Sequence, residues 1–188
     1  MYHYKNIFNY QFDDIYQNIT LHQDTITKDN ITFKESRLTN WYSPFPFTYS
    51  NKIMPPQPFN PFLQDLLNQV NQFLNYSFDS ILVNYYQDLH IGMNWHSDPI
   101  DLWEDNFAIL SFGYPRTLQF RHIHNFNLKI DFLLNHNDLL HIIDINKFFH
   151  HRLKKENNYN NYNNHNLDHN HDTQRISLVF KKLKILHS

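Results

Sequence analysis

A single helical pattern followed by a long series of strand patterns constrains the fold of this chain most. Proline can begin a helix because the first helical position needs no hydrogen-bond donor, and apolar side chains recur at helical spacing from Pro61 to Leu74. Beyond residue 78, short apolar runs predict strands over residues 79–86, 89–96, 106–113, 116–123, 126–134, 138–145, 147–153 and 174–182. Eight strands after one helix indicate a mainly β protein, a double-sheet jelly roll (double-stranded β-helix).

The chain has 188 residues and should contain one main domain. Residues 1–30 are polar and weakly patterned, so we expect an N-terminal extension there and the domain itself over residues 31–188. Aromatic residues alternate with prolines over residues 31–60, which is typical of ordered loops and short edge strands. The Asn-rich segment at about 157–172 has too few apolar side chains to offset its ordering entropy, so we expect an insert between the last two strands.

The composition excludes several classes of function. Two glycines, far apart, exclude a Gly-rich phosphate loop and a dinucleotide-binding fingerprint. The lack of cysteine excludes disulfides, thiolate zinc sites and a cysteine nucleophile. No apolar leader and no run of about 18 apolar residues is present, so we expect an intracellular, soluble monomer without a membrane partner. With a formal charge of −2, any contact with nucleic acid would depend on local basic patches.

A histidine and an aspartate two residues apart, followed much later by another histidine, are the best candidates for a metal site. The His-x-Asp spacing occurs as His22/Asp24, His96/Asp98 and His136/Asp138. Only the middle copy follows an apolar run, residues 80–86, that predicts a strand. It also leaves 151 − 96 = 55 residues before a later histidine, which is room for several strands that bring the chain back.

Two histidines and one carboxylate suit a particular metal chemistry. They can occupy one face of Fe(II) and leave positions open for a co-substrate and O2. His96 and Asp98 would point to the same side of a strand end, because side chains two apart share a face. Either His150 or His151 could supply the third ligand, and since adjacent strand residues face opposite ways, only one of them can.

Arg175 precedes an apolar run, residues 176–180, which predicts the clearest late strand. An unpaired charge buried in such a strand is very costly. A carboxylate of a small dianion would be a natural partner, because a guanidinium binds it through two charge-assisted hydrogen bonds. The alternative is a structural salt bridge.

With these residues in place, the chain resembles the AlkB-type Fe(II)/2-oxoglutarate dioxygenases that demethylate nucleic acids, most of all their eukaryotic DNA-repair branch. The resemblance runs from about residue 37 to 182. It covers RLTNWY (37–42), FTYS (47–50), NYY (84–86), IG (91–92), WHSD (95–98), ILSFG (109–113), RTLQFRH (116–122), LL (139–140), HR (151–152) and RISLVFK (175–181).

The resemblance implies iron held by His96, Asp98 and His151, because the family pairs its second histidine ligand with a following arginine. It also implies 2-oxoglutarate and O2 as co-substrates, with the 2-oxoglutarate site formed by Asn84, Tyr86, Arg175, Ser177 and Lys181. Substrate-binding candidates are Trp41, Tyr42, Phe47, Tyr49 and Arg121, the first four in a lid over the modified base. A basic cluster of Lys147, Arg152, Lys154 and Lys155 could contact phosphate. The expected partner is alkylated DNA or RNA carrying 1-methyladenine or 3-methylcytosine.

Four positions depart from the family pattern. Leu89 lies where a glycine is usual, and Ser177 replaces an asparagine. Lys181 replaces an arginine, which keeps the charge but loses the planar fork. Ile100 replaces an acidic residue and bears on base recognition. Two other functions therefore stay open: a dioxygenase of the same fold acting on protein or a small molecule, and a catalytically silent nucleic-acid-binding protein.

Overall fold

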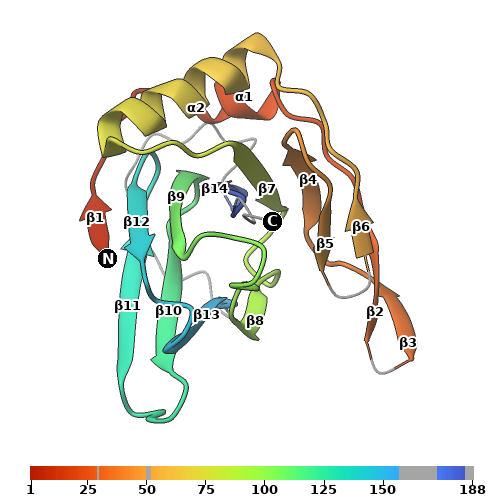
Figure 1. The fold of residues 1–188 in the computed structure, drawn as a ribbon, viewed down its shortest axis with the longest axis vertical. Helices are drawn as coiled ribbons and strands as arrows, with labels where there is room; N and C mark the ends of the chain where they lie inside the picture. The colour runs from red at the N-terminus through yellow and green to blue at the C-terminus, as the bar shows by residue number, and fades with distance from the viewer. Residues whose placement is uncertain (29, 50–51, 157–172, 185–188) are drawn as a thin grey trace.

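The computed structural model describes residues 1–28, 30–49, 52–156 and 173–184 (Figure 1). Its larger sheet has the strand order β1-β12-β9-β14-β7-β4 and its smaller sheet the order β11-β10-β13-β8. The larger sheet contains β1 (Tyr2–Tyr4), β4 (Leu38–Tyr42), β7 (Ser80–Tyr86), β9 (Asn106–Gly113), β12 (Leu139–Ile143) and β14 (Arg175–Lys181). The smaller sheet contains β8 (Met93–His96), β10 (Arg116–His122), β11 (Lys129–Leu134) and β13 (Phe149–Leu153).

From β7 to β14 the chain passes repeatedly between the two sheets. Strands β7, β9, β12 and β14 lie in the larger sheet, and β8, β10, β11 and β13 lie in the smaller one, with antiparallel neighbours throughout. This alternation is the topology of a jelly roll. The expected fold class, mainly β with a double-stranded β-helix, is therefore confirmed.

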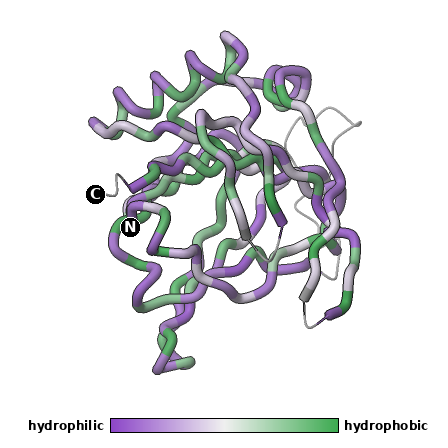
Figure 2. Tube along the Cα trace, turned by 45° about the vertical axis from the view of Figure 1, so that its right-hand side comes forward, coloured by the Kyte–Doolittle hydropathy of each residue, from purple (hydrophilic) through white to green (hydrophobic). Residues whose placement is uncertain are grey.

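Helix α2 (Pro61–Leu74) covers the outer face of the larger sheet (Figure 1). It begins where the Asn60 side chain accepts a hydrogen bond from the Leu63 amide, with proline at the first position, and it ends at Asn75 in the left-handed conformation. Its buried face packs against the strands as one apolar cluster, and Figure 2 shows polar and apolar stretches alternating along this helix. Asparagine serves at such left-handed positions in this glycine-poor chain.

A second apolar cluster lies between the two sheets, with Phe107 and Val179 of the larger sheet meeting Phe120 of the smaller one. Because side chains alternate along a strand, β14 points Ile176 and its period-2 partners toward α2 and the intervening residues toward the smaller sheet. The polar residues of β14, beginning with Arg175, therefore face the interior of the jelly roll.

Two hairpins lie beside β4 on one side of the molecule (Figure 1). They are β2 (Thr25–Lys28) with β3 (Ile31–Lys34), and β5 (Phe47–Tyr49) with β6 (Lys52–Met54). A buried Lys52 joins them, because its ammonium contacts the carboxylates of Asp24 and Glu35, the latter at 3.0 Å. The edge strands expected over residues 31–60 are present here.

The structure corrects the starts of two strands and adds detail at the N-terminus. Strand β11 begins at residue 129, not 126, because residues 126–127 form a turn. Strand β8 begins at residue 93, not 89, because the Asp88 carboxylate accepts hydrogen bonds from the His90 and Ile91 amides and holds a turn there. Before residue 30, β1 pairs with β12, and α1 (Phe12–Tyr16) buries two of its residues. The proposed domain boundary stays a prediction, and the predicted Asn-rich insert lies outside the described residues.

None of the helices in the described part of the chain has the length and apolar character needed to cross a membrane.

Candidate metal centre

Three candidate ligands meet between the smaller sheet and the loop that follows β8. His151 on β13 lies directly opposite His96 on β8 in the strand register, and their ring centroids are 4.2 Å apart. Asp98 follows two residues after His96, with 3.9 Å between its Oδ1 and His96 Nε2. The three ligand atoms lie within 4.8 Å of one another, close enough to share one ion. The structure thus brings together the three residues that the sequence singled out.

The two imidazoles are oriented in ways that suit a metal. His96 Nδ1 donates to the Asn94 carbonyl at 2.9 Å, which leaves the Nε2 lone pair available. A hydrogen bond of this kind commonly fixes the tautomer of a metal-binding histidine. His151 is buried, and its Nδ1 has no hydrogen-bond partner among the described residues. The adjacent His150 points to the outer face of the sheet, where it lies opposite Arg121 in the strand register.

The electrostatics keep these ligands in the form that a metal requires. Burial lowers the pKa of His151 to about 3, so its ring is neutral at pH 7. Loss of hydration also lowers the pKa of His96, although 34% of that side chain is exposed. Burial opposes ionisation of Asp98, but the ammonium of Lys181 and the two imidazoles outweigh it and lower the pKa of the carboxyl group. The centre therefore presents two neutral nitrogen donors and one carboxylate.

Lys181 lies on the interior face of β14 and forms an ion pair with Asp98 Oδ2. Its ammonium also lies 5.2 Å from the Phe107 ring centroid and 6.0 Å from that of Trp103. Lys181, which was predicted to bind the co-substrate, therefore forms an ion pair with a candidate metal ligand. It also lies between the metal centre and the rings of Phe107 and Trp103.

Arg175 is 1% exposed and lies further along the same interior face. Its guanidinium donates to the Ser111 hydroxyl at 2.6 Å and to the Leu134 carbonyl at 3.2 Å, while its buried Nε has no partner in the part of the chain that the structure describes. Burial lowers its pKa to about 10, so it remains charged at neutral pH. Within the described residues it forms no salt bridge, and the expected alternative of a structural ion pair therefore lacks support.

The other predicted co-substrate residues surround Arg175. Tyr86 is opposite it in the β7–β14 register and is buried, which raises the pKa of the phenol. Ser177 lies opposite Asn84, and the Asn84 side chain accepts a hydrogen bond from Arg37 Nε at 2.8 Å. These residues share the interior wall that the larger sheet contributes.

Two predicted substrate residues, Trp41 and Phe47, belong to a buried aromatic cluster with Met54 and Trp103. The ring centroids of Trp41 and Phe47 are 5.1 Å apart, and the Phe47 ring packs edge-on against Trp103 with 5.4 Å between their centroids. Trp103 also has a buried indole N–H without a partner among the described residues. Through Trp103 and Lys181 this cluster adjoins the metal centre.

The remaining substrate candidates lie elsewhere. Tyr42 packs beneath α2, on the other face of the larger sheet, and its hydroxyl accepts from the Thr20 amide. Tyr49 ends β5, but its side chain lies outside the described part of the structure. Arg121 lies on the outer face of the smaller sheet, 4.4 Å from the centroid of Trp95. Three lysines of the predicted basic cluster are exposed, Lys147, Lys154 and Lys155, while Arg152 is half-buried.

Another His-x-Asp pair has a structural role that the structure explains. Asp138 accepts hydrogen bonds from the amides of Asn6 and Asn135 and from the His3 ring, each at 2.9 Å. Burial opposes ionisation of Asp138, but these hydrogen bonds outweigh it and lower the pKa. His136 accepts from the Gly113 amide and contacts the Tyr10 carbonyl, so both ring nitrogens are used.

The sequence did not identify Ser111, Trp103 or Arg116. Arg116 is fully buried and donates to the carbonyls of Asp88, Ile91 and Lys154, which ties the loop before β8 to the end of β13. Ser111 and Arg116 lie in segments that carry the family resemblance, 109–113 and 116–122, but no role was assigned to either, and Trp103 lies in no such segment.

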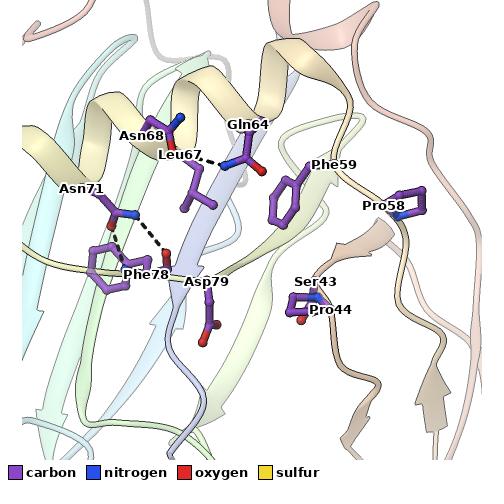
Figure 3. A pocket seen from close by; sticks show the side chains of 10 residues that line it. All are labelled: Ser43, Pro44, Pro58, Phe59, Gln64, Leu67, Asn68, Asn71, Phe78 and Asp79. Carbon is purple, nitrogen blue, oxygen red and sulfur yellow. Dashed lines mark hydrogen bonds between the residues drawn. The ribbon is translucent and has the colours of Figure 1, made fainter.

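A hollow of about 460 Å³ lies on the α2 side of the larger sheet, lined among others by Phe59, Asn71 and Asp79 (Figure 3). The larger sheet separates it from the metal centre, because α2 covers the outer face and the candidate ligands lie on the inner side. We assign it no role.

Residues 6–181 match the 2OG-Fe(II) oxygenase superfamily, and the chain belongs to this superfamily. It is 34% identical over 119 residues to bovine alpha-ketoglutarate-dependent dioxygenase alkB homolog 3, which covers 58% of this chain and 40% of that protein. The human protein of the same name is 34% identical over 118 residues, with 58% and 39% covered. An uncharacterised protein of Acanthamoeba polyphaga mimivirus is 31% identical over 123 residues, 64% of each chain.

These relatives confirm the expected resemblance to AlkB-type dioxygenases, although the match spans only about two fifths of the mammalian proteins. Membership of the superfamily implies Fe(II), with 2-oxoglutarate and O2 as co-substrates. The donor set fits: two neutral imidazoles and an ionised carboxylate converge, and His151 has a buried nitrogen without a partner among the described residues.

Proposed function

We propose that this protein is an Fe(II)/2-oxoglutarate-dependent dioxygenase that oxidatively demethylates N-alkylated bases in DNA or RNA. The observation that carries the proposal is the cluster of His96, Asp98 and His151, within 4.8 Å, in an interior that also holds a buried Arg175 without a carboxylate partner among the described residues. The resemblance to AlkB-type enzymes supports the substrate class.

His96, Asp98 and His151 would hold the iron. When bound, the iron supplies activation of O2 for oxidation of both 2-oxoglutarate and the methyl group. Lys181 keeps Asp98 ionised and fixes the orientation of its carboxylate through Oδ2. The Asn94 carbonyl holds the proton of His96 on Nδ1, which directs Nε2 toward the centre.

Arg175 would bind the distal carboxylate of 2-oxoglutarate. Its Nε–H is a donor without a partner among the described residues, and a buried guanidinium that has no carboxylate partner there favours an anion. Tyr86, Asn84 and Ser177 would line the same wall. Lys181 contributes positive charge near the centre without the second planar fork of an arginine.

The proposed reaction uses both oxygen atoms of O2. One oxygen atom of O2 enters succinate as 2-oxoglutarate loses CO2, and the other enters a C–H bond of the N-methyl group. The resulting hemiaminal breaks its N–C bond, releases formaldehyde and leaves the proton on the base nitrogen. Methyl groups of 1-methyladenine and 3-methylcytosine lie on the pairing edge, so the base must leave the stack before it can react.

Trp41, Phe47 and Trp103 are the aromatic groups that we propose would stack on that base. They are packed against one another here, so a bound base would separate Phe47 from Trp103. We leave Tyr42 out of this pocket, because it packs beneath α2.

The test is mass spectrometry of products from a panel of methylated DNA, RNA, nucleosides, peptides and small acids, with His150→Ala as a matched control for His151→Ala. We expect loss of the methyl group with equimolar formaldehyde and succinate for a methylated oligonucleotide. Hydroxylation of a peptide or small molecule alone would favour a different dioxygenase. Binding of oligonucleotide without succinate release from any compound would favour a silent binding protein.

A further inference from the structure

The outer face of the smaller sheet carries an indole that contacts two guanidinium groups. The Arg121 Cζ lies 4.4 Å from the Trp95 ring centroid, and the Arg152 Cζ lies 4.5 Å from it. The Arg121 Cζ also lies 4.5 Å from the ring centroid of Phe126, a residue that is 59% exposed. We call Trp95, Arg121, Arg152 and Phe126 the stacked basic surface.

This surface is preformed by contacts within the sheet. Arg152 Nε donates to Gln119 Oε1 at 2.7 Å, and Gln119 Nε2 donates to Asp131 Oδ2 at 2.8 Å. Stacking on aromatic faces orients a guanidinium while leaving N–H groups at its edge available. Two planar forks are therefore held in place before any ligand arrives.

Neither residue directly opposite Arg121 in the strand register is acidic. In the strand register Arg121 lies between Lys129 of β11 and His150 of β13. Asp131 lies two residues along β11 from Lys129, opposite Gln119, and its carboxylate accepts a hydrogen bond from the Gln119 side chain. A local basic patch exists on a chain whose formal charge is −2.

The stacked basic surface lies on the reverse side of the strands that carry the candidate metal ligands. Trp95 precedes His96 on β8, and Arg152 follows His151 on β13. Because adjacent strand residues face opposite sides, Trp95 and Arg152 face outward and the two histidines face inward. Strand β8 is the edge of the smaller sheet. Because 34% of the His96 side chain is exposed, the centre is open to solvent next to this edge.

We propose that the stacked basic surface binds the phosphodiester backbone of a single nucleic-acid strand, beside the base that reaches the metal centre past the β8 edge. Planar guanidinium forks match phosphate oxygens, and the exposed Phe126 ring offers a face on which a neighbouring base can stack. The proposal rests on the proposed function for its substrate. It adds where the strand lies and which residues hold it.

The experiment measures binding of the full chain to a fluorescent, unmethylated single-stranded oligonucleotide by anisotropy over a range of salt concentrations. The variant is Arg121→Gln, and Arg121→Lys keeps the charge without the planar fork. Lys5→Gln is the matched control, because Lys5 is exposed and follows β1, at the far edge of the other sheet. Thermal melting checks that each variant is folded.

We expect Arg121→Gln to weaken binding at least about tenfold, as loss of a hydrogen bond to a charged group does. The slope of the logarithm of the binding constant against the logarithm of the salt concentration should also become shallower by about 0.7. This is the value for one phosphate contact with a single strand. Arg121→Lys should keep the slope but bind more weakly, and Lys5→Gln should match the wild type.

Equal affinities and slopes for Arg121→Gln and Lys5→Gln would overturn the proposal. So would equally tight binding of a polyglutamate peptide, which would indicate a general cationic patch. Failure of the proposed function would be distinguishable: the oligonucleotide would bind through Arg121 as expected, yet its methylated form would keep the methyl group.

Discussion

Replacing Arg175 by lysine should weaken binding of 2-oxoglutarate far more than it weakens the fold. The guanidinium donates to Ser111 and Leu134, and its buried Nε has no partner among the described residues. A lysine ammonium donates from a single nitrogen and cannot replace three nitrogens held in one plane. Truncating one side of a buried charged pair costs about 2–5 kcal/mol, which is about 30- to 4,000-fold in Kd.

Isothermal titration calorimetry of 2-oxoglutarate with Mn(II) in place of iron measures this Kd without turnover. Arg116→Lys is the matched control, because Arg116 is equally buried but donates to three main-chain carbonyls. That control should lower Tm without a comparable rise in Kd. An unchanged Kd for Arg175→Lys, or an equal rise in both variants, would refute the role given to Arg175.

Three further predictions concern the metal centre and the fold. His96→Ala should abolish Fe(II) binding in equilibrium dialysis while His150→Ala retains it; equal binding by both would contradict the assignment. Asp138→Asn should lower stability by about 1–3 kcal/mol at pH 7. Since the folded-state pKa of Asp138 lies below the reference of 3.8, this contribution is present above pH 3.8 and is lost as pH falls below it, so the two melting curves should converge in acid; a constant gap would argue against it. Gly92→Ala should cost about 1–3 kcal/mol by overpacking, because a Cβ there would lie 2.6 Å from the Leu153 carbonyl oxygen, and an unchanged Tm would show that the loop can yield.

The sequence predicted the parts of the fold that local periodicity encodes. Strand β14 contains a continuous apolar run, and the helix from Pro61 shows helical apolar spacing, so both were predicted to within a residue or so. The polar β1 could not be recognised, because it is a strand only through its pairing with β12. The start of β8 was misplaced, because the turn before it depends on the Asp88 side chain.

Some residues of the candidate site could also be predicted from the sequence, whereas their contacts with distant elements could not. Alternation along β13 leaves only one of two adjacent histidines facing inward, and the family resemblance selected His151. Nothing in the sequence could show that Ser111 contacts Arg175 or that Trp103 adjoins Lys181, because those contacts join elements distant along the chain. Tyr42 lies in the stretch that suggested a lid, yet strand alternation directs it beneath α2.

The most direct test of the central claim is the location of iron in crystals of the protein grown anaerobically with Fe(II). An anomalous difference map at the iron edge should show one peak within bonding distance of His96, Asp98 and His151. A peak at other residues, or no peak between these three in a protein that retains its fold, would contradict the account.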